Sequence, residues 1–244
     1  MEKAVAFSPT KRIAVVTGAN KGVGLEICRQ LSSNGVTVIL TARDDNRGRE
    51  AVKTLHESGF SDVVFHQLDL MDPSSIGSLA NFINTQFHKL DILVNNAGVS
   101  GIIADAEAFT SLLNLSINEF LSNEKAKDVL SNVDDRTEEK IDQVVKRFLE
   151  DAKEGLLENN GWPVNFSAYV VSKAALNAYT RILAKKIPKI SINAVSPGFV
   201  KTDLNFNTGE LTVEEGARGP VMLALAPDGG PSGLFFDQME LSTF

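Results

Sequence analysis

The sequence predicts an α/β fold in which helices cover both faces of a doubly wound parallel sheet, and three observations support this prediction. First, short apolar runs rich in β-branched residues recur at 13–16, 36–41, 63–67 and 91–94. Second, helical patterns separate these runs, as parallel strands require. Third, a glycine-rich turn joins the first run to the first helix. The length of 244 residues, 43% of them hydrophobic, suits one domain over residues 1–244.

Charge and cysteine content argue against several classes of partner. The formal net charge is -7 and Lys and Arg do not cluster, so we expect no nucleic-acid partner. Cys28 is the only cysteine, which leaves no disulfide framework and no metal-ligand cluster and fits a reducing compartment. Residues 1–10 are too short an apolar run for a signal peptide, and no run approaches the ~20 apolar residues of a membrane span. We therefore expect a soluble, cytoplasmic protein without a metal.

The glycine-rich turn at 17–24 is the first candidate site. It reads T-G-A-N-K-G-V-G, between a strand pattern and a helix pattern. A side chain would hold the backbone away from a pyrophosphate, whose charge is met by free N–H groups and by the positive end of the helix dipole. A plain surface turn is the alternative. The candidate ligands for a dinucleotide in this turn are Gly18, Asn20, Lys21, Gly22, Val23 and Gly24.

Arg43, at the end of the second apolar run, bears on the choice of dinucleotide. An acidic residue at this point would bind both ribose hydroxyls of NAD, whereas a guanidinium suits the 2′-phosphate of NADP. Arg43 and Lys21 therefore favour NADPH. The alternative is that Arg43 is a solvated loop charge beside Asp44 and Asp45.

Two further turns follow the third and fourth apolar runs. Asp69 and Leu70 come after the third run, and Asn95-Asn96-Ala97-Gly98 come after the fourth. Taken alone, both are ordinary turn sequences.

The middle of the chain carries helical, charged sequence and no convincing strand. A helix is expected from Asp135 and Thr137 onward, with apolar positions from Ile141 to Ala152 at a 3.6-residue period. We expect this amphipathic element to pack on the body of the protein, although a solvated cover is also consistent with the pattern. In either case, residues 105–162 suit a helical insertion that acts as a lid over a substrate pocket.

Tyr169 and Lys173 form the second candidate site, on a helix expected to run to about residue 186. Residues four apart share a helical face, so the ammonium is expected near the phenol. A nearby cation lowers the pKa of a phenol from about 10, which suits a general acid acting on a carbonyl oxygen. A simple surface pair is the alternative.

A strand is expected at 190–195, followed by S-P-G-F-V-K-T. Pro197-Gly198 by itself is a generic turn signal. Residues 205–219 have the polar character of a substrate loop, 221–226 are expected to be helical, and 233–236 could form the last strand.

Taken in order, T-G-A-N-K-G-V-G, N-N-A-G, Y-V-V-S-K and S-P-G-F-V-K-T-D resemble the short-chain dehydrogenase/reductase family. Within that family the chain is most similar to the plant carbonyl reductases of the neomenthol dehydrogenase, menthone reductase and salutaridine reductase group. The resemblance implies a Rossmann-type fold and reversible, NADPH-dependent reduction of a ketone or aldehyde, such as a cyclic or terpenoid carbonyl. It also implies a monomer, because the insertion covers the helix face that other members use to dimerise.

The resemblance also implies roles for single residues. Tyr169 gives a proton to the carbonyl oxygen, and Lys173 lowers the phenol pKa and holds the ribose. Asp69 and Leu70 meet the adenine, and Asn95 ties neighbouring backbone together. The remaining positions, which approach the cofactor or back its nicotinamide end, are Ala97, Gly98, Pro197, Gly198, Val200 and Thr202.

One family element is missing from the sequence. The family places a helix with an asparagine, and then an apolar strand ending in serines, between N-N-A-G and the tyrosine helix. Neither pattern is found here, as if a segment were deleted in a splice variant. The nearby candidates are Ser111, Ser116 and Ser167 for the serine, and Asn114 and Asn118 for the asparagine.

The missing strand has two expected consequences. The strands on either side of the gap would have unpaired edges, and an oxyanion donor would be lost, which costs about a hundredfold or more in rate. The alternatives to an active reductase are therefore a catalytically impaired nucleotide-binding protein and an isoform that does not fold stably.

Overall fold

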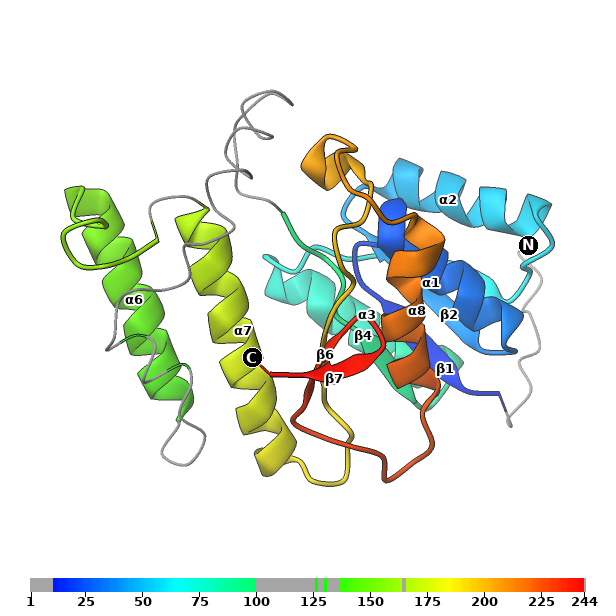
Figure 1. Ribbon diagram of the computed structural model, residues 1–244. Helices are drawn as coiled ribbons and strands as arrows, with labels where there is room; N and C mark the ends of the chain where they lie inside the picture. The colour runs from blue at the N-terminus through cyan, green and yellow to red at the C-terminus, as the bar shows by residue number, and fades with distance from the viewer. Residues whose placement is uncertain (1–10, 100–125, 127–129, 131–136, 164–165, 244) are drawn as a thin grey trace. The chain divides into compact units, whose positions relative to one another are not determined.

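The computed structural model describes residues 11–99, 126, 130, 137–163 and 166–243 (Figure 1). The chain divides into two compact units. The first comprises Met1–Gly98, Phe199–Asp203 and Gly209–Leu225. The second comprises Val99–Gly198, Leu204–Thr208 and Ala226–Phe244.

A four-stranded parallel sheet forms the centre of the first unit. Its strands are β1 (Ile13–Val16), β2 (Thr37–Ala42), β3 (Val63–Gln67) and β4 (Ile92–Val94), in the order β3-β2-β1-β4. Helices α1 (Gly22–Ser33), α2 (Asp45–Glu57) and α3 (Pro73–Gln86) connect consecutive strands. The four apolar runs of the sequence thus become the four strands, with boundaries shifted by a residue at most.

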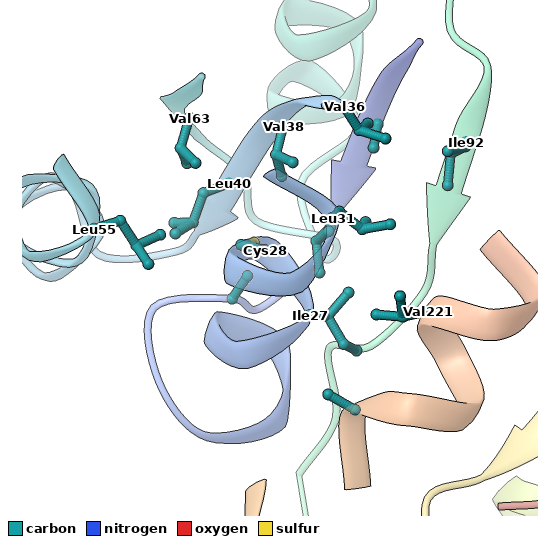
Figure 2. Close-up of a cluster of buried hydrophobic side chains, with 14 of the residues drawn as sticks. Ile27, Cys28, Leu31, Val36, Val38, Leu40, Leu55, Val63, Ile92 and Val221 are labelled. Atoms are coloured by element: carbon teal, nitrogen blue, oxygen red, sulfur yellow. The ribbon is translucent and has the colours of Figure 1, made fainter. Parts of the chain in front are cut away.

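Side chains alternate across β1, and each face of the sheet has its own core. Ala14 and Val16 lie in a cluster with α1, α2 and α8 (Val213–Leu225), whereas Ile13 and Val15 lie in a second cluster with Leu79 of α3. Figure 2 shows the first cluster, in which Ile27, Cys28 and Leu31 of α1 lie among side chains of β2 and β4. Helices therefore cover both faces, and the predicted doubly wound α/β fold is confirmed.

Cys28 is fully buried in this first cluster, and burial raises the pKa of its thiol. A buried thiol behaves as a small hydrophobic residue. Elsewhere in the first unit, Asp72 caps α3 by accepting from the N–H of Ser74 at 2.9 Å, and Pro73 is the first helical residue. Both features follow the usual preferences for a helix N-terminus.

Two packed helices dominate the second unit. The amphipathic helix α6 (Glu138–Glu154) begins after its N-cap Thr137 and packs on α7 (Ser167–Lys186). Ile141 of α6 clusters with Ala175 and Ala178 of α7. The part of the predicted apolar face from Ile141 to Phe148 therefore packs against α7, whereas Leu149 and Ala152 are exposed.

A buried polar contact joins α6 to the loop that follows it. Asp151 is 1% exposed, accepts a hydrogen bond from Nε1 of Trp162 at 2.8 Å and pairs with Arg147 at 3.0 Å. The Trp162 ring meets Phe148 edge-on, with centroids 5.3 Å apart. The Trp162 hydrogen bond is the main reason that the pKa of Asp151 lies below its ordinary value.

A short three-stranded sheet completes the second unit. β5 (Ala194–Ser196) pairs in parallel with β6 (Phe235–Asp237), and β6 pairs antiparallel with β7 (Glu240–Ser242). The strand expected from residue 190 begins only at 194, because Ile192 is instead bonded to the 232–233 loop through Ser232 Oγ and the N–H of Gly233. The expected last strand is shifted to β6, and β7, whose three residues are all exposed, was not predicted.

The two strands that flank the predicted deletion are edge strands in the described part of the chain. Among the described residues, β4 is bonded to β1 alone and β5 to β6 alone, so each strand has one unpaired edge. Leu93 of β4 is 55% exposed, which is unusual for an apolar residue in a parallel sheet. Ser111, Ser116, Asn114 and Asn118 lie outside the described residues.

Among the residues that the structure describes, no helix has the length and apolar character needed to cross a membrane.

Candidate active site

The glycine turn packs directly against the N-N-A-G turn in the first unit. A Cβ added at Gly18 would lie 2.8 Å from Cα of Ala97, and one added at Gly24 would overlap Nδ2 of Asn96. Gly18 and Gly22 also have left-handed φ angles of 62° and 60°, which favour glycine. The glycines thus allow the two protein turns to pack closely together.

Thr17 and Asn96 fasten these two turns together. Thr17 Oγ1 accepts hydrogen bonds from the backbone N–H groups of Asn96 and Ala97, both at 3.0 Å. In return, Asn96 Nδ2 donates to the carbonyl oxygens of Thr17 at 2.9 Å and Gly18 at 3.2 Å. The expectation that Asn95 ties the backbone together is therefore wrong, since Asn96 performs this role. Asn95 is exposed.

The N-terminus of α1 is suited to an anion. Its N-cap, Lys21, has no side-chain hydrogen bond to the helix, and no acidic residue lies in the first turn. The partial positive charge of the helix end is therefore not offset by a local carboxylate on α1. Asn20, Gly22 and Val23 are half-buried in the same turn. A phosphate group fits the chemistry of this part of the glycine turn, residues 18–24, which we call the cradle.

The segment Phe199–Asp203 lies against the glycine turn within the first unit. Cγ2 of Thr202 is 3.6 Å from the position of a Cβ at Gly22, and Asp203 Oδ2 is 2.8 Å from Lys21 Nζ. The Val200 side chain is 5% exposed, and a Cβ on Gly216 would overlap it. Thr202 is therefore placed beside the cradle, whereas Val200 turns its side chain into the protein interior.

The ends of β2 and β3 carry the residues predicted for the adenosine side of the cofactor. Arg43 follows β2 and is exposed, and Leu70 after β3 is 47% exposed. One carboxylate oxygen of Asp69 accepts from the N–H of Met71 at 2.9 Å, so this residue also shapes its own turn. The carboxyl ends of β1 to β4 thus bring the glycine turn, Arg43, Asp69 and the N-N-A-G turn to one edge of the sheet.

In the second unit, Tyr169 and Lys173 share one face of α7. Lys173 Nζ lies 5.5 Å from the centroid of the Tyr169 ring, over its face. Partial burial raises the pKa of Tyr169, so the expected lowering by Lys173 is wrong for this state of the protein. The ammonium lies over the ring in a cation–π arrangement, and partial burial is the cause of the raised pKa of Tyr169.

Ser167 does not follow a strand, as the serine of the family pattern does. It is the first residue of α7 and therefore lies on a helix, two positions before Tyr169. Residues two apart on a helix do not share a face, so Ser167 and Tyr169 lie on different faces of α7. Pro197 and Gly198, also in the second unit, follow β5 in a turn where Gly198 has a φ of 80°.

Two signals for the site were overlooked in the sequence. Thr17 and Asn96 are polar residues at the ends of neighbouring parallel strands, where side chains of the sheet edge converge. That position could have identified them as partners in holding the two turns together.

The fold and these motifs define the class of protein. Residues 12–211 match the short chain dehydrogenase family, and the chain belongs to this family. It is 50% identical to the (+)-neomenthol dehydrogenase of Arabidopsis thaliana, over 96% of this chain and 99% of the relative. The solved salutaridine reductase of Papaver somniferum is 43% identical, with a TM-score of 0.87 over 93% of this chain and 99% of that one. The solved menthone neomenthol reductase of Mentha piperita is 39% identical, with a TM-score of 0.80 over 95% and 100%.

These comparisons confirm the predicted family and its Rossmann-type fold, and with them an oxidoreductase. They also bear on the missing segment. The alignment with the Arabidopsis relative spans 292 positions, whereas the chain has 244 residues, so at least 48 aligned positions have no counterpart here. The sequence-based expectation of a deletion agrees with this difference.

Proposed function

We propose that this protein is an NADPH-dependent reductase that converts a cyclic or terpenoid ketone, or a small aldehyde, to an alcohol in a reversible reaction. The observation that carries the proposal is the cradle at the start of α1, fixed by Thr17 and Asn96 at the carboxyl edge of the parallel sheet. The named activities of the neomenthol dehydrogenase and salutaridine reductase relatives support the substrate class. A relative named carbonyl reductase [NADPH] 3, from Mus musculus and 37% identical, supports the cofactor.

The residues of the cradle would hold the phosphates. The N–H groups at the start of α1 and the Lys21 ammonium would meet the pyrophosphate or the 2′-phosphate, and Arg43 would meet the 2′-phosphate. Asp69 and Leu70 would meet the adenine. The positions proposed for the nicotinamide side and its approach to the sheet are Asn95, Ala97, Gly98, Pro197, Gly198, Val200 and Thr202.

When bound, NADPH supplies the hydride for the reduction. Tyr169 gives the proton from its hydroxyl to the substrate oxygen, and Lys173 holds the ribose and orients the phenol. Because burial raises the pKa of Tyr169, this phenol keeps its proton at neutral pH. Its protonation state therefore suits the acid role in the reductive direction.

A second candidate function is nucleotide binding without catalysis. It is favoured by the position of Ser167 on α7 and by the 48 or more aligned positions that the chain lacks. Without a serine to stabilise developing negative charge on the substrate oxygen, the rate would fall about a hundredfold or more. Both candidates use the same cradle, so binding of the cofactor does not separate them.

We further propose one domain over residues 1–244, with residues 105–162 as a helical cover, in a monomeric cytoplasmic protein. The packing of α6 over Ala175 and Ala178 of α7 supports a monomer, because it covers a face of α7. The single cysteine supports a reducing compartment.

The test is NADPH oxidation with a panel of cyclic ketones and aldehydes, compared among the native chain, Tyr169→Phe and Tyr179→Phe. Tyr179 is the other tyrosine of the sequence and lies on the same helix, so it is a matched control. We expect Tyr169→Phe to lose turnover and Tyr179→Phe to keep it. A folded native chain that binds NADPH but turns over nothing would support the non-catalytic function instead.

A further inference from the structure

Asp203 places a carboxylate beside the lysine of the glycine turn. Lys21 Nζ and Asp203 Oδ2 are 2.8 Å apart, and the two side chains are 60% and 64% exposed. Lys21 immediately precedes α1, at the positive end of the helix. The carboxylate therefore contacts the same ammonium that the proposed function assigns to a phosphate.

The backbone around Asp203 is held independently of this ion pair. The N–H of Lys201 donates to the carbonyl oxygen of Leu211 at 2.8 Å, and the N–H of Leu211 donates to Phe199 at 3.0 Å. Val200 is buried, and a Cβ on Gly216 of α8 would overlap it. Removing the Asp203 charge should therefore leave the segment Phe199–Asp203 in place.

The position of Asp203 is electrostatically unfavourable for a bound phosphate. No acidic residue lies in the first turn of α1, so Asp203 brings a negative charge to this helix end from a distant part of the sequence. A phosphate bound to Lys21 would lie near the carboxylate, and like charges at that range repel. The Lys21 ammonium is a compact charge that must be shared between the carboxylate and the phosphate or transferred from one to the other.

We propose that Asp203 lowers the affinity for the dinucleotide by competing with one of its phosphate groups for Lys21. This inference rests on the proposed function. In the free protein Asp203 holds Lys21, and binding of the dinucleotide exchanges the carboxylate for a phosphate. The ion pair thus lowers the affinity for the cofactor and favours its release.

The test measures the dissociation constants of NADPH and NADH by calorimetry, without any turnover. Asp203→Asn should bind NADPH about two- to fivefold more tightly, the range expected for an exposed ion pair. A gain for NADPH alone assigns Lys21 to the 2′-phosphate, and a gain for both assigns it to the pyrophosphate. Either result supports the competition. In a Lys21→Met background, Asp203→Asn should give a much smaller gain.

Asp62→Asn is the matched control. It breaks a 2.7 Å ion pair with Lys11, and both residues precede strands β3 and β1, at the opposite edge of the sheet. This variant should bind NADPH like the native chain. The competition would be overturned, and the proposed function left intact, by either of two results. One is that Asp203→Asn binds NADPH no more tightly than the native chain, and the other is that Asp203→Asn gives the same gain in the Lys21→Met background. Failure of the folded native chain to bind either nucleotide would overturn the proposed function as well.

Discussion

Asn96 donates a hydrogen bond from its side-chain amide to the carbonyl oxygen of Thr17, 2.9 Å away, and so joins residues 79 positions apart in the sequence. The contact connects the end of β4 to the end of β1 at the point where the glycine turn begins. The geometry of the cradle therefore depends on a residue outside the glycine motif.

Asn96→Ala should destabilise the protein by about 1–3 kcal/mol, because it leaves the carbonyl oxygens of Thr17 and Gly18 without this donor in a partly buried turn. Urea denaturation measures the free energy of unfolding. The neighbouring variant Asn95→Ala should stay within about 0.5 kcal/mol of the native chain, since Asn95 is exposed. Equal losses of stability in Asn96→Ala and Asn95→Ala would contradict the conclusion that Asn96 joins the two turns.

Gly24→Ala and Gly77→Ala should have opposite effects on stability although both glycines are helical. A Cβ at Gly24 would overlap Nδ2 of Asn96 and lie 2.9 Å from Cα of Ala19, so we expect a loss of about 1–3 kcal/mol. A Cβ at Gly77 of α3 meets nothing within 4 Å, so alanine should stabilise the helix by about 0.5–1 kcal/mol. Thermal and urea unfolding distinguish the two signs, and a gain in Gly24→Ala would refute the close packing.

The free energy of unfolding should depend on pH through Asp151. Its pKa is lowered in the folded protein, chiefly by the Trp162 hydrogen bond. This contribution is present above the unfolded-state pKa of about 4 and is lost as the pH falls through the lower folded-state value. In the native chain, the urea concentration at the unfolding midpoint should therefore fall as the pH is lowered below 4. Trp162→Phe should make this fall smaller. Asp142→Asn, at an exposed position of α6, should keep the decline.

Tyr169 should ionise above pH 10 in the protein without cofactor, because burial raises the pKa of its phenol. Tyrosinate absorbance follows the titration, and the difference between the native chain and Tyr169→Phe isolates this residue, since Tyr179 is the one other tyrosine. The stability linked to Tyr169 is complete below about pH 10 and is lost as the pH rises through the folded-state pKa. A midpoint below 10 would show that Lys173 controls the phenol.

The sequence predicts the first unit well because its signals are local. Apolar runs fix β1 to β4, and the glycines between β1 and α1 fix the cradle. The second sheet is predicted less well: β5 begins later than its apolar run, because Ile192 bonds to the 232–233 loop, and β7 has no buried residue to mark it. Burial, which depends on distant partners, is the information missing from these patterns.

In the candidate site, too, some features follow from the sequence pattern and others do not. Spacing correctly places Tyr169 and Lys173 on one helical face, yet it does not reveal that the ammonium lies over the ring. Nor does the N-N-A-G motif reveal which asparagine points toward Thr17, because that depends on the backbone conformation after β4. Side-chain direction within a motif is thus set by the backbone conformation and not by the spacing of residues.

Because Cys28 is buried between α1 and the sheet, its reactivity reports the local opening of α1. The thiol is fully buried and its pKa is raised, so it is shielded from alkylating reagents while α1 is packed on the sheet. No second cysteine competes for the reagent. The rate at which iodoacetamide labels the native protein therefore reports how often α1 separates transiently from the sheet. Because α1 begins at the glycine turn, this rate also measures how often the candidate nucleotide site is disrupted.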